Sequence, residues 1–307
     1  GLVPSEKRPV GWSGLGVQGP MARTVPDLCL MLSAMAADDA GDPLSHTVRD
    51  GAGRGAAGRG VPGHYFPPPR VDLSRLRVAA TEDFGYAPTE RGVRKTFRRR
   101  LASLAPLFQQ IDHAHPDSAG ADEAFAILRA GNFLAAHRDK VANTPELVGP
   151  NVRANVAEGL EYSLEDHARA SVIQTRMYRD WQRFFGNADV IVSPAITVSP
   201  RPWSELFPRA IDGVPTKSYF HWLGLAYGVT LVGHPAVSLP LGRDAAGMPF
   251  GLQIVGPRGG DAFVLGVAAA IESAVAGDAE LARPLPDLDA LRRAPPIRDM
   301  PGFLSFD

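Results

Sequence analysis

The sequence is poor in cysteine, in long apolar runs and in excess charge of either sign. Its one cysteine, Cys29, excludes internal disulfide frameworks and zinc or iron–sulfur sites built from several cysteines. The best apolar stretches, residues 28–37 and 263–271, are about half the roughly 18 residues that a membrane-spanning helix needs. The 32 Lys and Arg against 33 Asp and Glu leave a formal net charge of −1. So small a charge gathers neither nucleic acid nor an anionic membrane surface.

The composition is otherwise that of an ordinary globular protein. With 45% hydrophobic and 21% charged residues, a wholly disordered chain is excluded, and 307 residues allow one large domain or two small ones. The opening residues, from Gly1 to Ser5, have neither the basic start nor the apolar middle of a secretory signal. We therefore expect a cytoplasmic protein, and a chain whose true beginning lies elsewhere.

The first predicted helix follows a glycine-rich opening over residues 1–23. Thr24 and Asp27 have the spacing of a capping box, and Pro26 is tolerated in a first helical turn. The apolar residues after them predict a buried helix of about 12 residues. Residues 51–70 combine Gly, Pro and Arg with almost nothing to bury, which predicts an exposed connector.

Short apolar runs alternate with helical periodicity in the rest of the chain, which predicts an α/β fold. A strand over 76–80, a helix over 89–104 and a strand over 107–111 form a βαβ unit, whose strands should pair in parallel. Residues 121–185 are mostly helical, with breaks near 143–145 and 159–163. The other expected elements are a buried strand over 189–193, a short helix over 217–227, a hairpin over 236–255 with Pro240 at an edge or bulge, a helix capped by Asp261, and an irregular tail from residue 283.

Two glycine patterns and one serine pattern resemble known motifs but predict neither a nucleotide-binding site nor a catalytic serine. Residues 14–19 and 53–58 both satisfy G-x-G-x-x-G, but neither lies between a strand and a helix, as a dinucleotide site requires. Ser13 lies in a near miss of the G-x-S-x-G nucleophile elbow, because Leu15 takes the last position. We interpret Ser13 as a turn residue and expect no nucleotide cofactor.

Polar clusters give equally weak signals. Residues 112–117 (DHAHPD) gather metal-ligand types at a strand end, but Pro116 favours a solvated turn, and we assign no metal site. Ser218 and His221 would share one face of a helix, yet no acidic residue lies nearby in sequence to orient the histidine. A lysine base would have to come from Lys7, Lys95, Lys140 or Lys217. No strong nucleophile constellation is visible.

Motifs near both ends of the chain resemble those of one enzyme family. G-L-V-P-S over 1–5, Q-G-P-M-A-R-T-V-P-D over 18–27 and G-D-P over 41–43 resemble the closing stretch of the amidase signature. Ser193-Pro194, G-H-P-A-V-S-L-P-L-G over 233–242 and M-P-F-G-L-Q-I-V-G over 248–256 resemble C-terminal blocks of the same family, in the same order. The chain thus resembles the C-terminal part of an amidase signature enzyme.

The resemblance implies a fold, a reaction and a location for the catalytic residues. The fold would be a mixed β-sheet flanked by helices on both faces, and the reaction would split a carboxylic amide into an acid and an amine or ammonia, with no metal or organic cofactor. In that family a nucleophilic serine, a second serine held by a cis peptide and a lysine all precede the G-L-x-P-S block, which begins here at Gly1. We therefore expect no catalytic residue in this chain and no amidase activity from it alone.

The same resemblance divides the chain and assigns structural roles. We interpret it as one partial amidase domain, with the end of the signature region over 1–50, a connector over 51–75, a C-terminal α/β part over 76–282 that carries a helical insertion over 121–186, and the tail over 283–307. The motif residues interpreted as structural are Gly19, Pro20, Arg23, Thr24, Asp27 and Gln253. Gln253 is included because a glutamine in a strand is more often a satisfied core group than a catalyst.

The substrate pocket is expected between the helical block over 121–185 and the proline-rich loop over 193–207. An aromatic lining would favour an aryl or alkyl amide. The candidate apolar contacts, each of which could equally serve in core packing, are Phe125, Phe133, Tyr162, Trp203, Phe220 and Trp222.

Two other functions stay open at this point. One is the A subunit of a tRNA-dependent amidotransferase, although the neutral charge does not favour contact with tRNA unless a partner subunit supplies it. The other is a non-catalytic binding module that keeps a remnant of the fold. The expected partner is a small-molecule amide, with neither nucleic acid nor membrane, and association into a homodimer stays open.

Overall fold

A five-stranded mixed sheet lies at the centre of the computed structural model, which describes residues 1–5, 8–45, 65–202 and 204–299. The strand order is β2-β1-β3-β7-β6. β1 pairs in parallel with β2 and β3, and β7 pairs antiparallel with β3 and β6. The strands are β1 (Arg77–Ala80), β2 (Gln110–His113), β3 (Val190–Pro194), β6 (Ala236–Arg243) and β7 (Pro249–Val255); a separate two-stranded sheet joins β4 (Ala210–Ile211) to β5 (Val214–Pro215). The predicted mixed sheet is confirmed.

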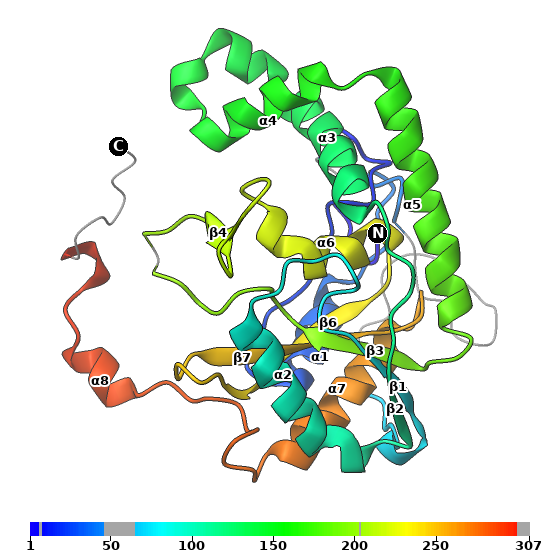
Figure 1. Ribbon diagram of the computed structural model, residues 1–307, viewed down its shortest axis with the longest axis vertical. Coiled ribbons are helices and arrows are strands. Elements are labelled where there is room, and N and C mark those ends of the chain that lie inside the picture. Colours follow the sequence, from blue (N-terminus) through cyan, green and yellow to red (C-terminus); the bar gives the residue numbers. More distant parts are fainter. Residues whose placement is uncertain (6–7, 46–64, 203, 300–307) are drawn as a thin grey trace.

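Helices cover both faces of the sheet because its inner strands alternate apolar side chains between two cores. Val190 and Val192 lie in one core, and Ile191 lies in the other. The first core also holds residues of α2 (Arg91–Leu104) and α7 (Asp261–Val275), and the second holds residues of α3 (Ala121–Asn143), α5 (Leu164–Phe184) and α6 (Gly224–Val232). Figure 1 shows α3, α4 (Pro150–Glu161) and α5 above the sheet, with α2 and α7 below it.

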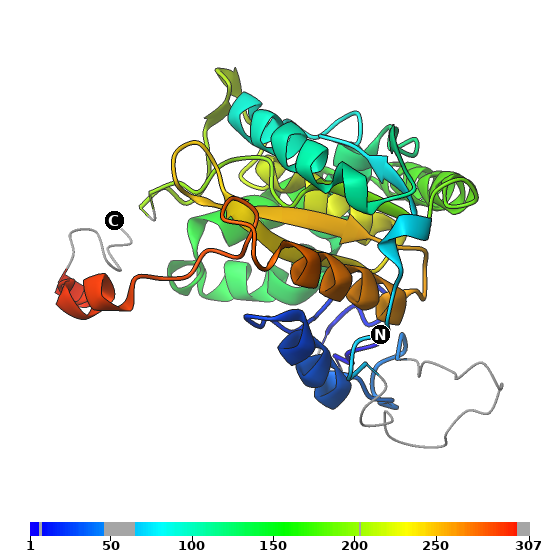
Figure 2. The ribbon, with the colours of Figure 1, turned by 90° about the horizontal axis from the view of Figure 1, so that it is seen from below.

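The first helix, α1 (Val25–Met35), packs outside α7 (Figure 2). The Glu272 carboxylate of α7 accepts the backbone N–H of Val25 at 3.0 Å, and the Thr24 hydroxyl accepts that of Asp27 at 3.2 Å. The predicted helix and its cap are confirmed, but the capping box is incomplete, because the Asp27 carboxylate accepts the Thr24 hydroxyl rather than a backbone N–H. The helix is also less buried than predicted, with Leu30 exposed.

The predicted βαβ unit, helical block and hairpin are present. The helical block breaks where expected, with a 3-10 turn over Pro145–Leu147 and a second break before α5. Ser163 and Asp166 cap α5 reciprocally, each side chain accepting the backbone N–H of the other. Pro240 lies in β6, an edge strand of the described sheet, where the register shifts before Arg243.

Two predicted elements in the middle of the chain differ in detail from the observed ones. β2 starts at Gln110, because residues 105–107 form a 3-10 turn. The helix expected over 217–227 is a 3-10 turn over His221–Leu223 followed by α6, which ends at Gly233 in the left-handed conformation.

At the C-terminal side, Asp261 is the first residue of α7 rather than its cap, which is Gly260. The tail contains a short helix, α8 (Leu288–Arg293), because the Asp287 carboxylate accepts the backbone N–H groups of Asp289 and Ala290. Most of the connector predicted over 51–70 lies outside the described residues, and the description resumes at Tyr65.

Two glycines near the turn between β6 and β7 give a matched test of this packing. Gly242 (φ 69°) and Gly247 (φ 78°) both lie in the left-handed region. A Cβ atom on Gly242 would overlap the Glu280 carbonyl oxygen, whereas one on Gly247 would meet nothing within 4 Å. We expect Gly247→Ala to lower the free energy of unfolding by about 1 kcal/mol, and Gly242→Ala by clearly more. Urea denaturation measures both, and equal losses would contradict the close approach of Glu280.

Candidate functional site

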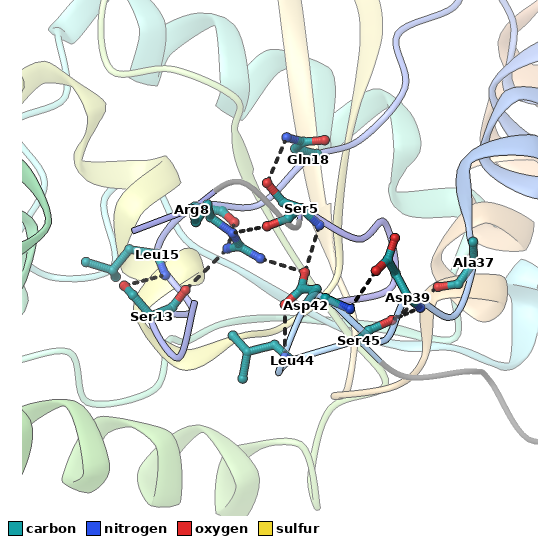
Figure 3. Close-up of polar contacts among 12 residues, drawn as sticks. Ser5, Arg8, Ser13, Leu15, Gln18, Ala37, Asp39, Asp42, Leu44 and Ser45 are labelled. Atoms are coloured by element: carbon teal, nitrogen blue, oxygen red, sulfur yellow. Dashed lines mark hydrogen bonds and ion pairs between the residues drawn. The ribbon is translucent and has the colours of Figure 1, made fainter. Parts of the chain in front are cut away.

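One buried carboxylate holds the N-terminal signature blocks together. Asp42, of the G-D-P block, accepts the backbone N–H of Ser5 at 2.8 Å, the backbone N–H of Leu44 at 2.9 Å and the Arg8 guanidinium at 2.9 Å (Figure 3). The Leu44 N–H, the Ser5 N–H and then Arg8 lower the pKa of Asp42 below its usual range. Asp42 lies in the G-D-P motif, but neither its bonds to Ser5 and Leu44 nor its ion pair with Arg8 was predicted from the sequence.

The signature region also reaches the helical block. Arg8 donates to the carbonyl of Ser13 at 3.3 Å, and the Ser13 hydroxyl accepts the Asn132 amide of α3 at 2.9 Å. Ser13 follows a turn, since its backbone N–H donates to the carbonyl of Val10. Ser13 therefore connects the N-terminal loop to α3.

One face of α3 contacts the segment from Lys217 to Val232. Asp122, Phe125, Arg129 and Phe133 are three or four residues apart, so their side chains follow one stripe of the helix. Their contacts across the interface are with Lys217, Tyr219, Phe220, His221 and Tyr227.

Asp122, in the first turn of α3, is the polar centre of this interface. Its carboxylate accepts the Tyr227 hydroxyl at 2.5 Å and the Lys217 ammonium at 3.0 Å, and lies 3.5 Å from Nε2 of His221. Burial and then Asp122 raise the pKa of Tyr227, so its phenol stays protonated and donates. Asp122 is the acidic partner of His221 that the sequence analysis did not find, because 99 positions separate the two residues.

His221 is buried and is held as a neutral ring. The backbone N–H of Lys217 donates to Nδ1 at 3.1 Å, so the ring proton belongs on Nε2, which faces Asp122. Burial lowers the pKa of His221, and the Lys217 charge acts in the same direction, while Asp122 opposes both. In the described part of the chain, the Ser218 hydroxyl makes no hydrogen bond with this ring.

Arg129 lies further along the same face, among aromatic rings. Its guanidinium donates to the Asn155 side-chain oxygen of α4 and to the Tyr219 hydroxyl. It also lies over the rings of Phe133 at 4.1 Å, Phe220 at 4.7 Å and Tyr219 at 5.1 Å from their centroids. Burial lowers the pKa of Arg129 to about 10, so the group stays cationic at neutral pH but poorly hydrated.

The predicted aromatic contacts fall into separate places. Phe125 stacks on Tyr227 at 4.3 Å and meets the edge of Phe220 at 5.5 Å, so Phe125, Phe133 and Phe220 gather at the α3 interface. Tyr162, just after α4, donates to the Glu158 carboxylate at 2.8 Å, and burial followed by Glu158 raises its pKa to about 12.

Trp222 belongs to a different place. It lines a cavity of about 340 Å³ under the proline-rich loop, together with Val93, Ile196, Val198, Phe207 and Phe250. Trp203 lies outside the described residues.

Gln253 ties α6 to the sheet. Its buried amide donates to the Ser193 hydroxyl of β3 at 3.0 Å and to the carbonyl of Leu225 at 3.1 Å. The Ser193 hydroxyl in turn donates to the carbonyl of Pro194 at 3.0 Å. Both side chains are therefore engaged in structural hydrogen bonds. The other motif residues that the sequence analysis interprets as structural include Gly19, Pro20 and Arg23, which lie in the loop before α1.

The described part of the chain offers neither a buried lysine base nor a metal cluster. Its lysines, Lys95, Lys140 and Lys217, are all exposed, and none pairs with a buried serine. No group of three or more His, Cys, Asp or Glu side chains that could hold a metal ion occurs among residues 1–5, 8–45, 65–202 and 204–299. Within these ranges, too, no helix is long and apolar enough to cross a bilayer.

Comparison with known sequences now identifies the family. The sequence pattern of the family described as Amidase matches residues 1–265. This chain belongs to the amidase signature family.

Its relatives are distant in sequence but similar in fold. An acylamidase from Rhodococcus erythropolis is 28% identical over 83% of this chain and 51% of its own length. The A subunit of a glutamyl-tRNA(Gln) amidotransferase from Ralstonia nicotianae is 29% identical over 85% of this chain and 57% of its own. The solved structure of a bacterial aryl acylamidase, at 18% identity, superposes with a TM-score of 0.75 over 89% of this chain and 56% of that one. The chain thus spans about half the length of the curated relatives it matches.

The buried histidine gives a pH-dependent stability. Because the folded-state pKa of His221 is lowered from its ordinary 6.5, its contribution is complete above that pH and is lost as the pH falls from 6.5 through the folded pKa. We expect the free energy of unfolding to fall less between about pH 7.5 and about pH 5.5 in His221→Gln than in the unchanged protein. Denaturant titrations at the two pH values measure this. His234, whose pKa burial also lowers, contributes equally to both proteins and cancels in the comparison. An identical pH dependence would contradict the depressed pKa of His221.

Proposed function

We propose that this chain is the substrate-facing part of an amide hydrolase whose catalytic serines and lysine precede Gly1 in a longer polypeptide. The observation that carries the proposal is the family match over residues 1–265, in a chain that covers only 51% to 57% of the relatives above. The G-L-V-P-S block at residues 1–5 supports it, because the family's nucleophile lies shortly before that block.

In this proposal the two parts of the enzyme have different tasks. The upstream serine attacks the amide carbonyl, the amine or ammonia leaves with a proton relayed through the second serine and the lysine, and water then hydrolyses the acyl-enzyme. The part described above holds the substrate. The α3 face, with Phe125, Phe133 and Phe220, contacts one side of it, and Trp222 with the cavity under the proline-rich loop is a second candidate surface.

A second candidate is the amidase component of a larger amidotransferase. The 29% identity to the A subunit of a glutamyl-tRNA(Gln) amidotransferase favours it. Such a component would need other subunits and a route for ammonia. The two functions differ in substrate, since the first acts on acyl amides in isolation and the second releases ammonia from a donor amide only within its assembly.

Activity of two lengths of the protein tests the proposal. In the family that this chain resembles, the nucleophilic serine lies in a G-G-S motif a short distance before the G-L-x-P-S block. We expect a polypeptide extended upstream through an in-frame G-G-S motif to hydrolyse 4-nitroacetanilide or glutamine. Residues 1–307 alone should be slower by about a factor of 10⁶ or more, since the triad supplies a rate enhancement of that order. Release of 4-nitroaniline or ammonia is the measurement, and replacing the serine of the G-G-S motif by alanine is the control.

Each other outcome has a distinct meaning. Comparable hydrolysis by both lengths would refute an upstream triad. Folded proteins of both lengths that hydrolyse neither amide would contradict a stand-alone amide hydrolase and favour either the amidotransferase component, which needs its assembly, or a non-catalytic binding module.

A further inference from the structure

Arg129 has only neutral hydrogen-bond partners within the described residues, whereas other arginines of this protein form ion pairs. Arg77 is joined to Asp189 at 2.9 Å, and Arg169 is joined to Glu123 at 2.7 Å. Within the described residues, no carboxylate oxygen lies within 4 Å of the Arg129 guanidinium; its hydrogen-bond partners there, Asn155 and Tyr219, are neutral.

The guanidinium also keeps unused donors. Arginine has five N–H groups, and two of them donate to Asn155 and Tyr219, so three have no partner in the described part of the chain. Because the side chain is only partly buried, these donors can reach a ligand. The three surrounding rings shield the face of the cation from water, which strengthens any bond to an anion.

The Tyr219 hydroxyl supplies one more donor at the same place. Its oxygen accepts both the Arg129 guanidinium and the Asn155 amide, the latter at 3.0 Å, so its own proton is free to donate outward. The Asn155 amide also donates to the carbonyl of Asn151, which fixes the orientation of its side chain. Arg129 of α3 and Tyr219, in the turn before His221, therefore hold their remaining donors next to each other.

Glu158 is the acidic residue that acts electrostatically on Arg129, but it does not form an ion pair with the guanidinium. Glu158 acts on Arg129 electrostatically and raises its pKa, but less than burial lowers it. The Glu158 carboxylate accepts the Tyr162 hydroxyl at 2.8 Å. The three ring contacts and two neutral hydrogen-bond partners stabilise the Arg129 cation, but they leave it without a contacting anion within the described residues.

We propose that Arg129 and Tyr219 form a binding site for a carboxylate, and that the amide substrate carries this carboxylate away from its scissile bond. The planar guanidinium matches a carboxylate in a bidentate geometry, and the adjacent rings of Phe133 and Phe220 suit an alkyl or aryl chain. The substrate class is therefore an amide of a dicarboxylic acid or an amide with an acidic leaving group. This inference rests on the proposed function for its substrate, but the site itself binds a carboxylate whether or not hydrolysis follows.

Direct binding to the full-length protein tests the site without any reaction. Glutarate is the probe, and glutaramide, which has the same length but no charge, is its control. We expect glutarate to bind and Arg129→Gln to weaken it by about 10- to 100-fold, as expected for loss of a charged hydrogen bond. Tyr219→Phe should weaken it less. Arg138→Gln removes the same charge from an exposed position of α3 and should change nothing. Isothermal titration calorimetry measures all four proteins.

Kinetics then test the role in substrate selection. Glutaryl 4-nitroanilide carries the carboxylate and pentanoyl 4-nitroanilide does not. We expect Arg129→Gln to raise KM for the glutaryl substrate by about 10- to 100-fold more than it raises KM for the pentanoyl substrate, with similar kcat changes for both, whereas Arg138→Gln should alter neither substrate's kinetics. The pentanoyl rate also shows that the variant is folded. Arg129→Lys should recover part of the affinity for the glutaryl substrate.

The outcomes separate this inference from the proposed function. If no amide is hydrolysed, the proposed function fails and glutarate binding still decides the carboxylate site. Equal glutarate affinity in Arg129→Gln, or equal damage to both substrates, would overturn the inference and leave Arg129 as a residue that packs α3 against α4. Preference for inorganic phosphate over glutarate would overturn the assignment of a carboxylate to this site. If Arg129→Gln does not fold, the Tyr219→Phe titration decides alone, and unchanged glutarate binding in that variant would overturn the inference.

Discussion

The attachment of α3 to the segment from Lys217 to Val232 is the contact on which the candidate site depends. Asp122 makes it in the first turn of α3, where it accepts Tyr227 and Lys217 and faces His221. At the other side of α6, Gln253 joins the carbonyl of Leu225 to the Ser193 hydroxyl of β3. α6 thus links the stripe of α3 side chains to the central sheet. A direct contact between α3 and the strands is not needed to hold this stripe in place.

Burial sets the chemistry of this interface. It raises the pKa of Tyr227 and lowers the pKa values of His221 and Arg129, so each group is held in one protonation state near neutral pH. The phenol donates and the imidazole is neutral, whereas the guanidinium keeps its charge with little water around it. Such an environment favours the binding of a polar ligand, because donors with little water around them lose few hydrogen bonds to water when the ligand binds.

Local patterns predicted much of the fold and less of the site. The Thr24 cap, the βαβ unit, the helix breaks before Pro145 and Ser163, and the β6–β7 hairpin all follow from residues close together in sequence. The pairing of Asp122 with His221, and of Asp42 with Ser5, joins residues far apart in sequence, and no local pattern indicates either pair. The resemblance to the family motifs predicted the family and the mixed sheet, but these motifs do not include Asp122.

The aromatic candidates show the same limit. Phe125, Phe133 and Phe220 gather at one interface, but Trp222 lies at a separate cavity, because the chain turns between Phe220 and α6. Arg129 was missed because an arginine on an amphipathic helix is usually solvated. The spacing of Asp122, Phe125, Arg129 and Phe133 along one helical stripe was the available signal.

We propose that this chain supports an amidase site whose nucleophile lies outside residues 1–307. Labelling the extended, full-length protein with a fluorophosphonate, followed by mass spectrometry of the labelled peptide, tests it most directly. We expect a single modified serine that precedes Gly1 and an unmodified Ser193, which is buried and hydrogen-bonded. Stoichiometric modification of Ser193, Ser218 or any other serine within residues 1–307 would contradict it.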